Sequence, residues 1–294
     1  MKKVSFAEFG GPDVLQLVDA EEPHAGPGQV RIAVRAAGVN PVDWRIREGQ
    51  ILGAHPVELP SGVGLDASGV VDEVGEGVEG VEVGDHVFGE GLSTYAEFAV
   101  LSAWARMPEG LTFEEAAGYP SVVETALRII REVGVQPGQT LLVSGASGGV
   151  GSAVLQIARE RGIAVIGTAG AANQDYLRSL GAVATTYGEG WVERVRRLGH
   201  VDAALDLAGS GVIRELVELT GDPQRVISIA DLGAPALGVR FSGVAGSVPE
   251  ALAEAAGLIS RGSSTSRLRS RTRSPRPLWR TSTARPVTRA GAGS

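Results

Sequence analysis

The sequence predicts an α/β protein with a β-rich N-terminal part followed by a doubly wound parallel sheet. Short apolar runs separated by glycine-centred turns dominate residues 1–118, which is typical of antiparallel strands. From residue 119 to residue 245, apolar runs of strand length alternate with helical patterns, which is typical of a parallel sheet covered by helices. The chain has 294 residues, which is long enough for two such domains.

The N-terminal part is expected to form one antiparallel domain over residues 1–118. The stretch QVRIAVRAAGVN alternates apolar and polar residues, as a half-buried strand does. The stretch ASGVVDEVGEGVEGVEVGDHVFG indicates short strands joined by glycine turns, and STYAEFAVL and ARMP indicate two further strands.

The second part is expected to form a ligand-binding domain over residues 119–245. Its apolar runs are TLLVSG, IAVIGTAG, AVATTY, VDAALDLAG and RVISIAD, with helical patterns between them. Ligands of such sheets bind beyond the carboxyl ends of the strands, where the strand order reverses. Residues 246–262 are predicted to form a helix that returns toward the N-terminal domain.

The glycine-rich stretch SGASGGVGSA joins the first strand of this sheet to its first helix. Gly145, Gly148 and Gly151 have a G-x-x-G-x-x-G spacing, and without Cβ atoms they let a pyrophosphate approach the backbone. The following helix offers unpaired N–H groups to that anion. A tight turn with close helix–strand packing is the alternative, but the surrounding β/α units favour dinucleotide binding. The other predicted contacts of this turn are Ser147, Gly149 and Val150.

The second strand of the sheet ends in a way that favours NADP over NAD. NAD sites usually place an acidic residue there to bind the ribose 2′-hydroxyl, whereas this strand ends at the uncharged Thr168, which we expect to contact the cofactor. Asp175 comes later and is expected to face solvent on a helix. Arg178 and Tyr187 are candidate contacts of the 2′-phosphate, although Arg178 also fits a solvated helix face.

Composition excludes several classes of site. The chain has no cysteine, so disulfides, thiolate nucleophiles and cysteine-ligated metals are excluded. The N-terminus lacks the apolar run of a signal peptide, and no segment has the length of a membrane span, so we expect a cytoplasmic protein without a membrane partner. The four histidines have no ligand spacing and are expected on the surface or in loops: His24, His55, His86 and His200.

Several motifs resemble the medium-chain dehydrogenase/reductase superfamily, in its zinc-independent quinone oxidoreductase (zeta-crystallin-like) branch. They are AAGVNPVDWRIREG, LDASGVVDEVGEGVEGVEVGDHVFG, TYAEFAV, TALRII, VSGASGGVGSAVLQIAR and GTAGAAN. The resemblance implies a GroES-like catalytic domain, a Rossmann domain that binds NADP, an active site in the cleft between them, and a homodimer formed through the stretch GVRFSGV. The zinc-using members carry a His-Glu pair where this chain has Leu65-Asp66, so no metal is expected.

The resemblance also implies roles for individual residues. It places Asn40 beside the nicotinamide, where its amide could orient an acceptor carbonyl, and capping of the turn before Pro41 is the alternative. Asp43 is expected to support this segment rather than donate a proton, and Thr125 matches a threonine near the nicotinamide. Further cofactor contacts are expected at the ends of the later strands: Leu207, Ala208, Ile229 and Ala230. Arg45, Val123 and Glu124 depart from the family pattern and could reshape the substrate pocket.

These features predict an NADPH-dependent oxidoreductase that transfers hydride to a quinone or conjugated carbonyl. The first alternative is an enoyl thioester reductase of the same superfamily. It would need a tyrosine near the Asn40 segment as proton donor, where Trp44 and Arg45 stand. The second alternative is a cofactor-binding protein with little turnover. The expected partner is a small molecule rather than nucleic acid.

The resemblance stops after Gly262. Residues 261–294 contain nine arginines and no acidic residue, and apolar periodicity is absent from them. We interpret residues 263–294 as the product of a frameshift near codon 262, which predicts a disordered tail. A basic tail that binds nucleic acid is the alternative, but no aromatic stacking pattern or folded module accompanies the arginines.

Overall fold

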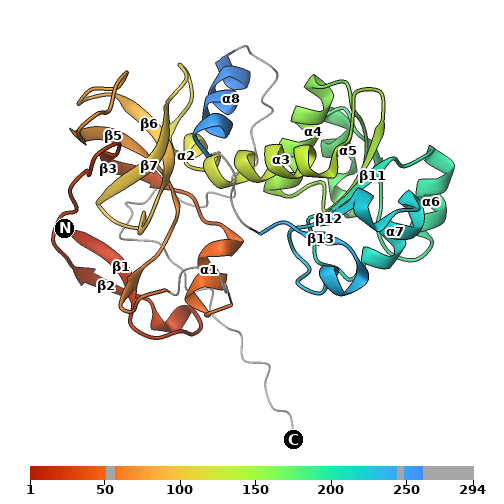
Figure 1. The fold of residues 1–294 in the computed structure, drawn as a ribbon, viewed down its shortest axis with the longest axis horizontal. Helices are drawn as coiled ribbons and strands as arrows, with labels where there is room; N and C mark the ends of the chain where they lie inside the picture. Colours follow the sequence, from red (N-terminus) through yellow and green to blue (C-terminus); the bar gives the residue numbers. More distant parts are fainter. Residues whose placement is uncertain (51–56, 244–247, 261–294) are drawn as a thin grey trace, which may run out of the picture.

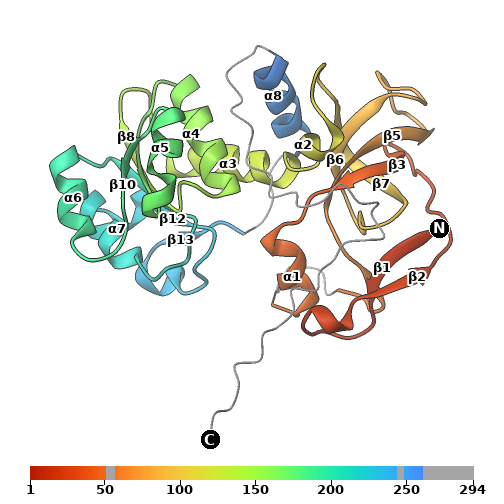
Figure 2. The ribbon, with the colours of Figure 1, turned by 180° about the vertical axis from the view of Figure 1, so that it is seen from behind.

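The computed structural model describes residues 1–50, 57–243 and 248–260. A β lobe and an α/β lobe lie side by side, joined by helix α3 (Pro120–Val133) (Figures 1 and 2). The predicted α/β class is therefore confirmed. His55 and the tail at 263–294 lie outside the described residues. Within the described part of the chain, every helix is too short or too polar to cross a bilayer.

The β lobe is built around a closed antiparallel barrel of four strands in the order β3-β5-β6-β7. Burial alternates along β3, as its sequence pattern predicts, and its inward residues Val30 and Ile32 are fully buried. The last strand runs without a break where the sequence suggested two strands, so that expectation was wrong. The strand bounds are β3 (Val30–Ala37), β5 (Asp66–Val74), β6 (His86–Gly91) and β7 (Phe98–Arg106).

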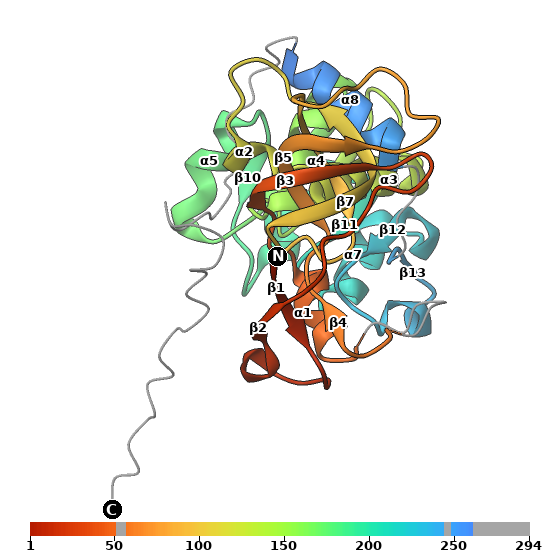
Figure 3. The ribbon, with the colours of Figure 1, turned by 90° about the vertical axis from the view of Figure 1, so that its left-hand side faces the viewer.

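A small antiparallel sheet lies below the barrel strands in Figure 3, with the order β2-β1-β4. The short helix α2 packs against β3 and β5 of the barrel, and α1 follows β3 in the chain. Pro41 begins α1, where a proline is favoured because its missing N–H has no acceptor within the helix. The bounds are β1 (Lys2–Phe6), β2 (Gln16–Asp19), β4 (Ser61–Gly62), α1 (Pro41–Arg47), α2 (Phe113–Ala116) and the 3₁₀ turn η1 (Pro12–Val14).

The α/β lobe contains a six-stranded parallel sheet in the order β10-β9-β8-β11-β12-β13. The chain starts at β8, moves outward to β10 and then crosses back to β11, so the strand order reverses between β8 and β11. The strands are β8 (Thr140–Ser144), β9 (Ala164–Thr168), β10 (Val183–Thr185), β11 (Ala203–Asp206), β12 (Val226–Ser228) and β13 (Arg240–Phe241).

Helices cover both faces of this sheet, which makes it doubly wound. One face packs Leu141 and Val143 of β8 with α3 and α4, and the other packs Leu142 with α6 and α7. Each central strand is therefore apolar on both sides, which explains its continuous apolar run. The helices are α4 (Gly149–Glu160), α5 (Gln174–Ser179), α6 (Trp191–Leu198) and α7 (Ile213–Thr220), with 3₁₀ turns η2 (Ala171–Asn173), η3 (Pro223–Arg225) and η4 (Ala234–Leu237).

Helix α8 (Val248–Ser260) lies beside α3 and contacts both α3 and strand β7 (Figure 1). Leu252 is fully buried in the same core as Phe88 of the barrel, and Glu254 forms an ion pair at 2.8 Å with Arg161, the C-cap residue of α4. The helix expected over residues 246–262 thus packs against the β lobe and the α/β lobe together.

Candidate functional site

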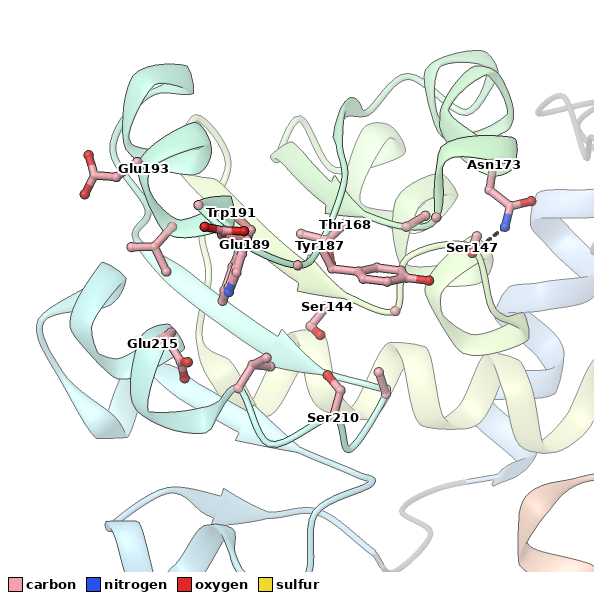
Figure 4. Close-up of a pocket in the computed structure, with 18 residues that line it drawn as sticks. Ser144, Ser147, Thr168, Asn173, Tyr187, Glu189, Trp191, Glu193, Ser210 and Glu215 are labelled. Carbon is pink, nitrogen blue, oxygen red and sulfur yellow. Dashed lines mark hydrogen bonds between the residues drawn. The ribbon is translucent and has the colours of Figure 1, made fainter.

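A cavity of about 930 Å³ opens at the carboxyl ends of the parallel strands (Figure 4). It lies beyond β8, β9, β10 and β11, where strand order reverses and where ligands of doubly wound sheets bind. Its lining includes the glycine-rich turn, the end of β9, the loop before α6 and the loop after β11. The residues are Ser144, Gly145, Ser147, Thr168, Ala169, Gly170, Asn173, Tyr187, Gly188, Glu189, Gly190, Trp191, Val192, Glu193, Ala208, Ser210, Val212 and Glu215.

The structure brings some of the predicted cofactor contacts to this cavity and leaves others outside its lining. Those in the lining are Gly145, Ser147, Thr168, Tyr187 and Ala208. Those outside it are Gly148, Gly149, Val150, Gly151, Arg178, Leu207, Ile229 and Ala230. Sequence reasoning missed Asn173, Trp191 and the carboxylates of Glu189, Glu193 and Glu215. Trp191, Glu193 and Glu215 lie on α6 and α7, and a helical pattern does not show which residues of a helix face a cavity.

The glycines of the turn are required for different physical reasons. Gly145 has φ +83°, a left-handed conformation that favours glycine. A Cβ on Gly151 would lie 2.6 Å from the carbonyl of Ala146, so this glycine lets α4 pack against the turn. A Cβ on Gly148 would meet only the Gly145 oxygen at 3.4 Å. Close packing therefore explains Gly151, whereas Gly148 keeps the space above the turn open.

Helix α4 begins two residues after Ser147, which lines the cavity. Gly148 is the N-cap residue, and Gly149 is the first helical residue. The first-turn N–H groups of a helix have no intrahelical acceptor and carry a partial positive charge. Within the described lining of the cavity there is no lysine or arginine, so these backbone groups are the donors suited to an anion.

Arg178 and Asp175 pair with each other on the outer face of α5. Their side chains are 57% and 99% exposed, and the Nη1 and Oδ1 atoms lie 2.7 Å apart. The expected solvent exposure of Asp175 is what the structure shows. At the cavity itself, Asn173 donates from Nδ2 to Ser147 Oγ at 3.4 Å, and the Tyr187 hydroxyl points toward this pair (Figure 4).

A buried carboxylate, which sequence reasoning missed, holds the two loops that follow β11 and β12. Asp206 is fully buried and its Oδ1 accepts the N–H groups of Ala208 and Gly209 at 3.2 and 3.0 Å. Ser228 Oγ donates to Asp206 Oδ2 at 2.8 Å and accepts the N–H groups of Ala230 and Asp231. The backbone around the predicted contacts at these strand ends is therefore fixed by one hydrogen-bonded pair.

Asn40 lies in the other lobe, at the N-cap of α1. Its backbone N–H donates to Asp43 Oδ2 at 2.7 Å, so Asp43 stabilises the start of the helix. The hydroxyl of Tyr95 donates to the same Asp43 oxygen at 2.8 Å. Burial raises the pKa of Asp43, while these two hydrogen bonds act in the opposite direction. Trp44 is partly exposed and carries the Arg45 guanidinium over its ring.

Asp66 on β5 is fully buried and connects Asn40 to helix α3. Its Oδ2 accepts Asn40 Nδ2 at 2.8 Å, and its Oδ1 accepts the Ser121 hydroxyl at 2.6 Å. Burial raises the pKa of Asp66 to about 7, against the lowering effect of the hydrogen bonds from Ser121 and Asn40. Thr125 lies one helical turn after Ser121, so the segment predicted to face the nicotinamide is linked to the helix that carries Thr125.

The raised pKa of Asp66 predicts a pH-dependent stability. The unfolded chain loses this proton near pH 3.8 and the native state near pH 7, so between these values the native state binds more protons. The free energy of unfolding should therefore fall as the pH rises through this window, by at most about 4 kcal/mol for this group. Urea denaturation of the wild type and of Asp66→Asn across the window should show a flatter profile for the variant. Parallel profiles would contradict the prediction.

Helix α3 carries a buried charged pair at the position where the sequence departs from the family pattern. Arg128 donates from Nε to Glu124 Oε1 at 2.9 Å and from Nη2 to Thr125 Oγ1 at 3.4 Å. Its Nη1 also contacts Ser242 Oγ, just after β13. Burial and the neighbouring Glu124 raise the pKa of Glu90 on β6. The surroundings of Thr125 are thus polar and charged.

Comparisons with known proteins agree with this geometry. Residues 26–113 match the alcohol dehydrogenase GroES-like domain family. The quinone oxidoreductase of Rattus norvegicus is 40% identical over 176 residues, which cover 58% of this chain and 53% of that protein. The pikromycin polyketide synthase component PikAII of Streptomyces venezuelae is 46% identical over 165 residues, 55% of this chain and 4% of that protein. The chain thus spans about half the length of the curated quinone oxidoreductase and a small part of the synthase.

Solved structures resemble the chain over most of its length. The quinone oxidoreductase from Coxiella burnetii has a TM-score of 0.77 and 31% identity, over 90% of this chain and 88% of that chain. The Escherichia coli quinone oxidoreductase complexed with NADPH has a TM-score of 0.76 and 25% identity, over 90% and 89% of the two chains. The two-lobed arrangement and the order of its parts are therefore shared with these proteins.

Proposed function

Since the chain belongs to the medium-chain dehydrogenase/reductase superfamily, in its zinc-independent quinone oxidoreductase branch, we propose that it is an NADPH-dependent oxidoreductase acting on quinones or conjugated carbonyls. The observation that carries the proposal is the cavity at the strand ends, with the amino end of α4 and the open space above Gly148 beside it. A pyrophosphate fits there, because a Cβ is missing where it would approach the backbone. NADPH, when bound, supplies the hydride.

In this proposal the protein's own residues bind the cofactor, orient the reacting groups and exclude water. The first-turn N–H groups of α4 hold the pyrophosphate, and the loops fixed by Asp206 and Ser228 hold the far side of the cofactor. Asn40 and Thr125 face the nicotinamide and the acceptor, and Asp43 holds the helix that carries Asn40 in place. The proposed acceptor is electron-poor, because Leu65 and Asp66 stand where the zinc-using members carry a His-Glu pair.

Neutral donors would bind the 2′-phosphate. Ser147, Asn173 and Tyr187 converge at one end of the cavity, and Gly170 leaves room for the Tyr187 hydroxyl, which a Cβ there would approach to 3.3 Å. Arg178, the charged residue proposed from the sequence, is paired with Asp175 outside the lining. The NADPH complex of the Escherichia coli relative supports this choice of cofactor.

The experiment that tests the proposal has two steps. Fluorescence titration with NADPH and with NADH measures binding, and the decrease in NADPH absorbance with a panel of quinones and enones measures turnover. Tight NADPH binding with turnover of at least one acceptor is expected. Binding without turnover would favour the cofactor-binding alternative, and absence of binding would overturn the proposal.

Tyr187→Phe should weaken NADPH binding about tenfold and leave NADH binding unchanged, because only NADPH carries the 2′-phosphate that the lost hydroxyl would contact. Tyr187 is 64% exposed, so the stability of the variant should equal that of the wild type. Arg178→Ala is the matched control and should change neither Kd. Equal losses for the two nucleotides in Tyr187→Phe would contradict the assignment. The measurement is the ratio of the two Kd values.

The match to a polyketide synthase component favours an enoyl thioester reductase as the second candidate. The tyrosine that this reaction would need near Asn40 is supplied by the fold, since Tyr95 contacts Asp43. However, the Tyr95 hydroxyl donates to a carboxylate. Its burial, and to a smaller extent the charge of Asp43, raise the pKa of Tyr95. Tyr95 is thus poorly suited to protonate a substrate. Enoyl thioesters belong in the acceptor panel, and preference for them over quinones would select this candidate.

A homodimer and a cytoplasmic location are also part of the proposal. Strand β13, which lies in the stretch GVRFSGV, is the edge strand of the parallel sheet. Within the described residues its outer edge pairs with no other strand, so a second copy of the chain can pair there. Light scattering in solution should give a mass twice that of the chain.

A further inference from the structure

The carboxylate of Asp66 collects hydrogen bonds from two segments that are distant in the sequence. Asn40, before α1, donates its side-chain amide to Oδ2 at 2.8 Å. Ser121, at the start of α3, donates its hydroxyl to Oδ1 at 2.6 Å and its backbone N–H to both oxygens at 3.1 and 3.2 Å. Both oxygens of the carboxylate therefore accept hydrogen bonds, which offsets the cost of burying this acid.

The chain packs closely around this carboxylate. Gly38 donates its N–H to the Asp66 backbone oxygen at 3.0 Å, and a Cβ on Gly38 would lie 2.8 Å from Asp66 Cβ and 2.4 Å from the Ala117 carbonyl. Asp66 has no accessible surface. The charged or titratable groups that act on it are Glu90 on the neighbouring strand β6 and Tyr95. The position of Asp66 relative to Asn40 is thus fixed by the backbone on both sides.

These contacts fix which way the Asn40 carboxamide points. The Nδ2 atom is directed at Asp66, which accepts hydrogen bonds and cannot donate one when ionised, so a flipped amide would place two acceptors against each other. The backbone N–H of Asn40 is held separately by Asp43. The Oδ1 atom and the second Nδ2 hydrogen of Asn40 are therefore held in one fixed order.

We propose that Asp66, supported by Ser121, is a positioning residue that sets the orientation of the Asn40 amide toward the electron acceptor. The inference rests on the proposed function, in which Asn40 faces the nicotinamide and the acceptor. Asp66 acts through Asn40 and has no contact with the reacting atoms. In Asp66→Asn, the new amide offers N–H donors in place of one carboxylate oxygen, and the Asn40 amide turns over to present the opposite atoms to the ligand.

A double-mutant cycle tests this coupling. Asp66→Asn, Asn40→Ala and the double variant are compared with the wild type in kcat and KM for the acceptor, Kd for NADPH, and midpoint of urea unfolding. Asp66→Asn should lower kcat/KM for the acceptor about tenfold, mainly through kcat, with the NADPH Kd within a factor of two. In the Asn40→Ala background the same substitution should cause no further loss of kcat/KM. Asp13→Asn, at an exposed carboxylate, is the control and should match the wild type.

The outcomes separate this inference from the proposed function. A further tenfold loss in the double variant would mean that Asp66 acts independently of Asn40 and would overturn the inference while leaving the oxidoreductase intact. If the wild type neither binds NADPH nor turns over an acceptor, the proposed function fails. The coupling between Asp66 and Asn40 is then tested by the unfolding midpoints alone. Non-additive midpoints would support the Asp66–Asn40 contact, and additive ones would overturn it. Ser121→Ala should reproduce part of the Asp66→Asn effect on kcat.

Discussion

Gly151→Ala is expected to destabilise the protein by about 2–3 kcal/mol, whereas Gly148→Ala, three residues earlier, is expected to cost only about 1 kcal/mol as a change of the N-cap residue and to weaken cofactor binding at least tenfold. A Cβ on Gly151 would lie 2.6 Å from the Ala146 carbonyl and from the Gly145 oxygen, which are backbone atoms that cannot move aside. Helix α4 would have to shift away from β8 and lose contacts in the core shared by Val154 and Leu141.

The contrast between the two glycines separates packing from ligand binding. Gly148 has φ −76° and ψ 177°, which alanine adopts freely, and the added methyl group would occupy the space proposed for the pyrophosphate. Urea denaturation and NADPH titration of both variants measure the two effects. Unchanged NADPH affinity in Gly148→Ala would contradict the placement of the pyrophosphate, and unchanged stability in Gly151→Ala would contradict the packing argument.

Asp206→Asn should lower the free energy of unfolding by about 2–4 kcal/mol and weaken NADPH binding. The carboxylate accepts three hydrogen bonds in a fully buried position, and an amide of the same shape turns one accepting oxygen into a donor. At least one buried N–H or O–H then lacks an acceptor, which costs about 1–3 kcal/mol for each group. The loop at Ala208, which lines the cavity, loses its anchor in the same step.

The measurements are urea denaturation and NADPH titration, with Asp175→Asn as the matched control. Asp175 has a side chain that is 99% exposed, so the same chemical change there should shift stability by less than about 0.5 kcal/mol. Ser228→Ala should weaken binding in the same direction as Asp206→Asn, because it removes the partner of the second loop. A stable Asp206→Asn protein with normal NADPH affinity would show that the loops are held by other contacts.

The amino-acid sequence alone determined the fold class, the two halves of the chain and the place of the glycine-rich turn. These features depend on interactions within a few residues: the alternation along β3, the apolar runs of β8 to β12, and a glycine spacing that one strand and one helix require. Local patterns of this kind can be recognised in the sequence, because each strand or helix buries its own side chains against a sheet.

Only the tertiary structure decided how the site is supported. Asp66 meets Asn40 and Ser121 across 26 and 55 residues, Tyr95 meets Asp43 across 52, and Asp206 meets Ser228 across 22. No periodicity marks such pairs, because each is formed where separate segments come together in the fold. Arg178 shows the same limit: its charge was visible in the sequence, but in the fold its side chain pairs with Asp175 on the surface of α5, outside the cavity lining.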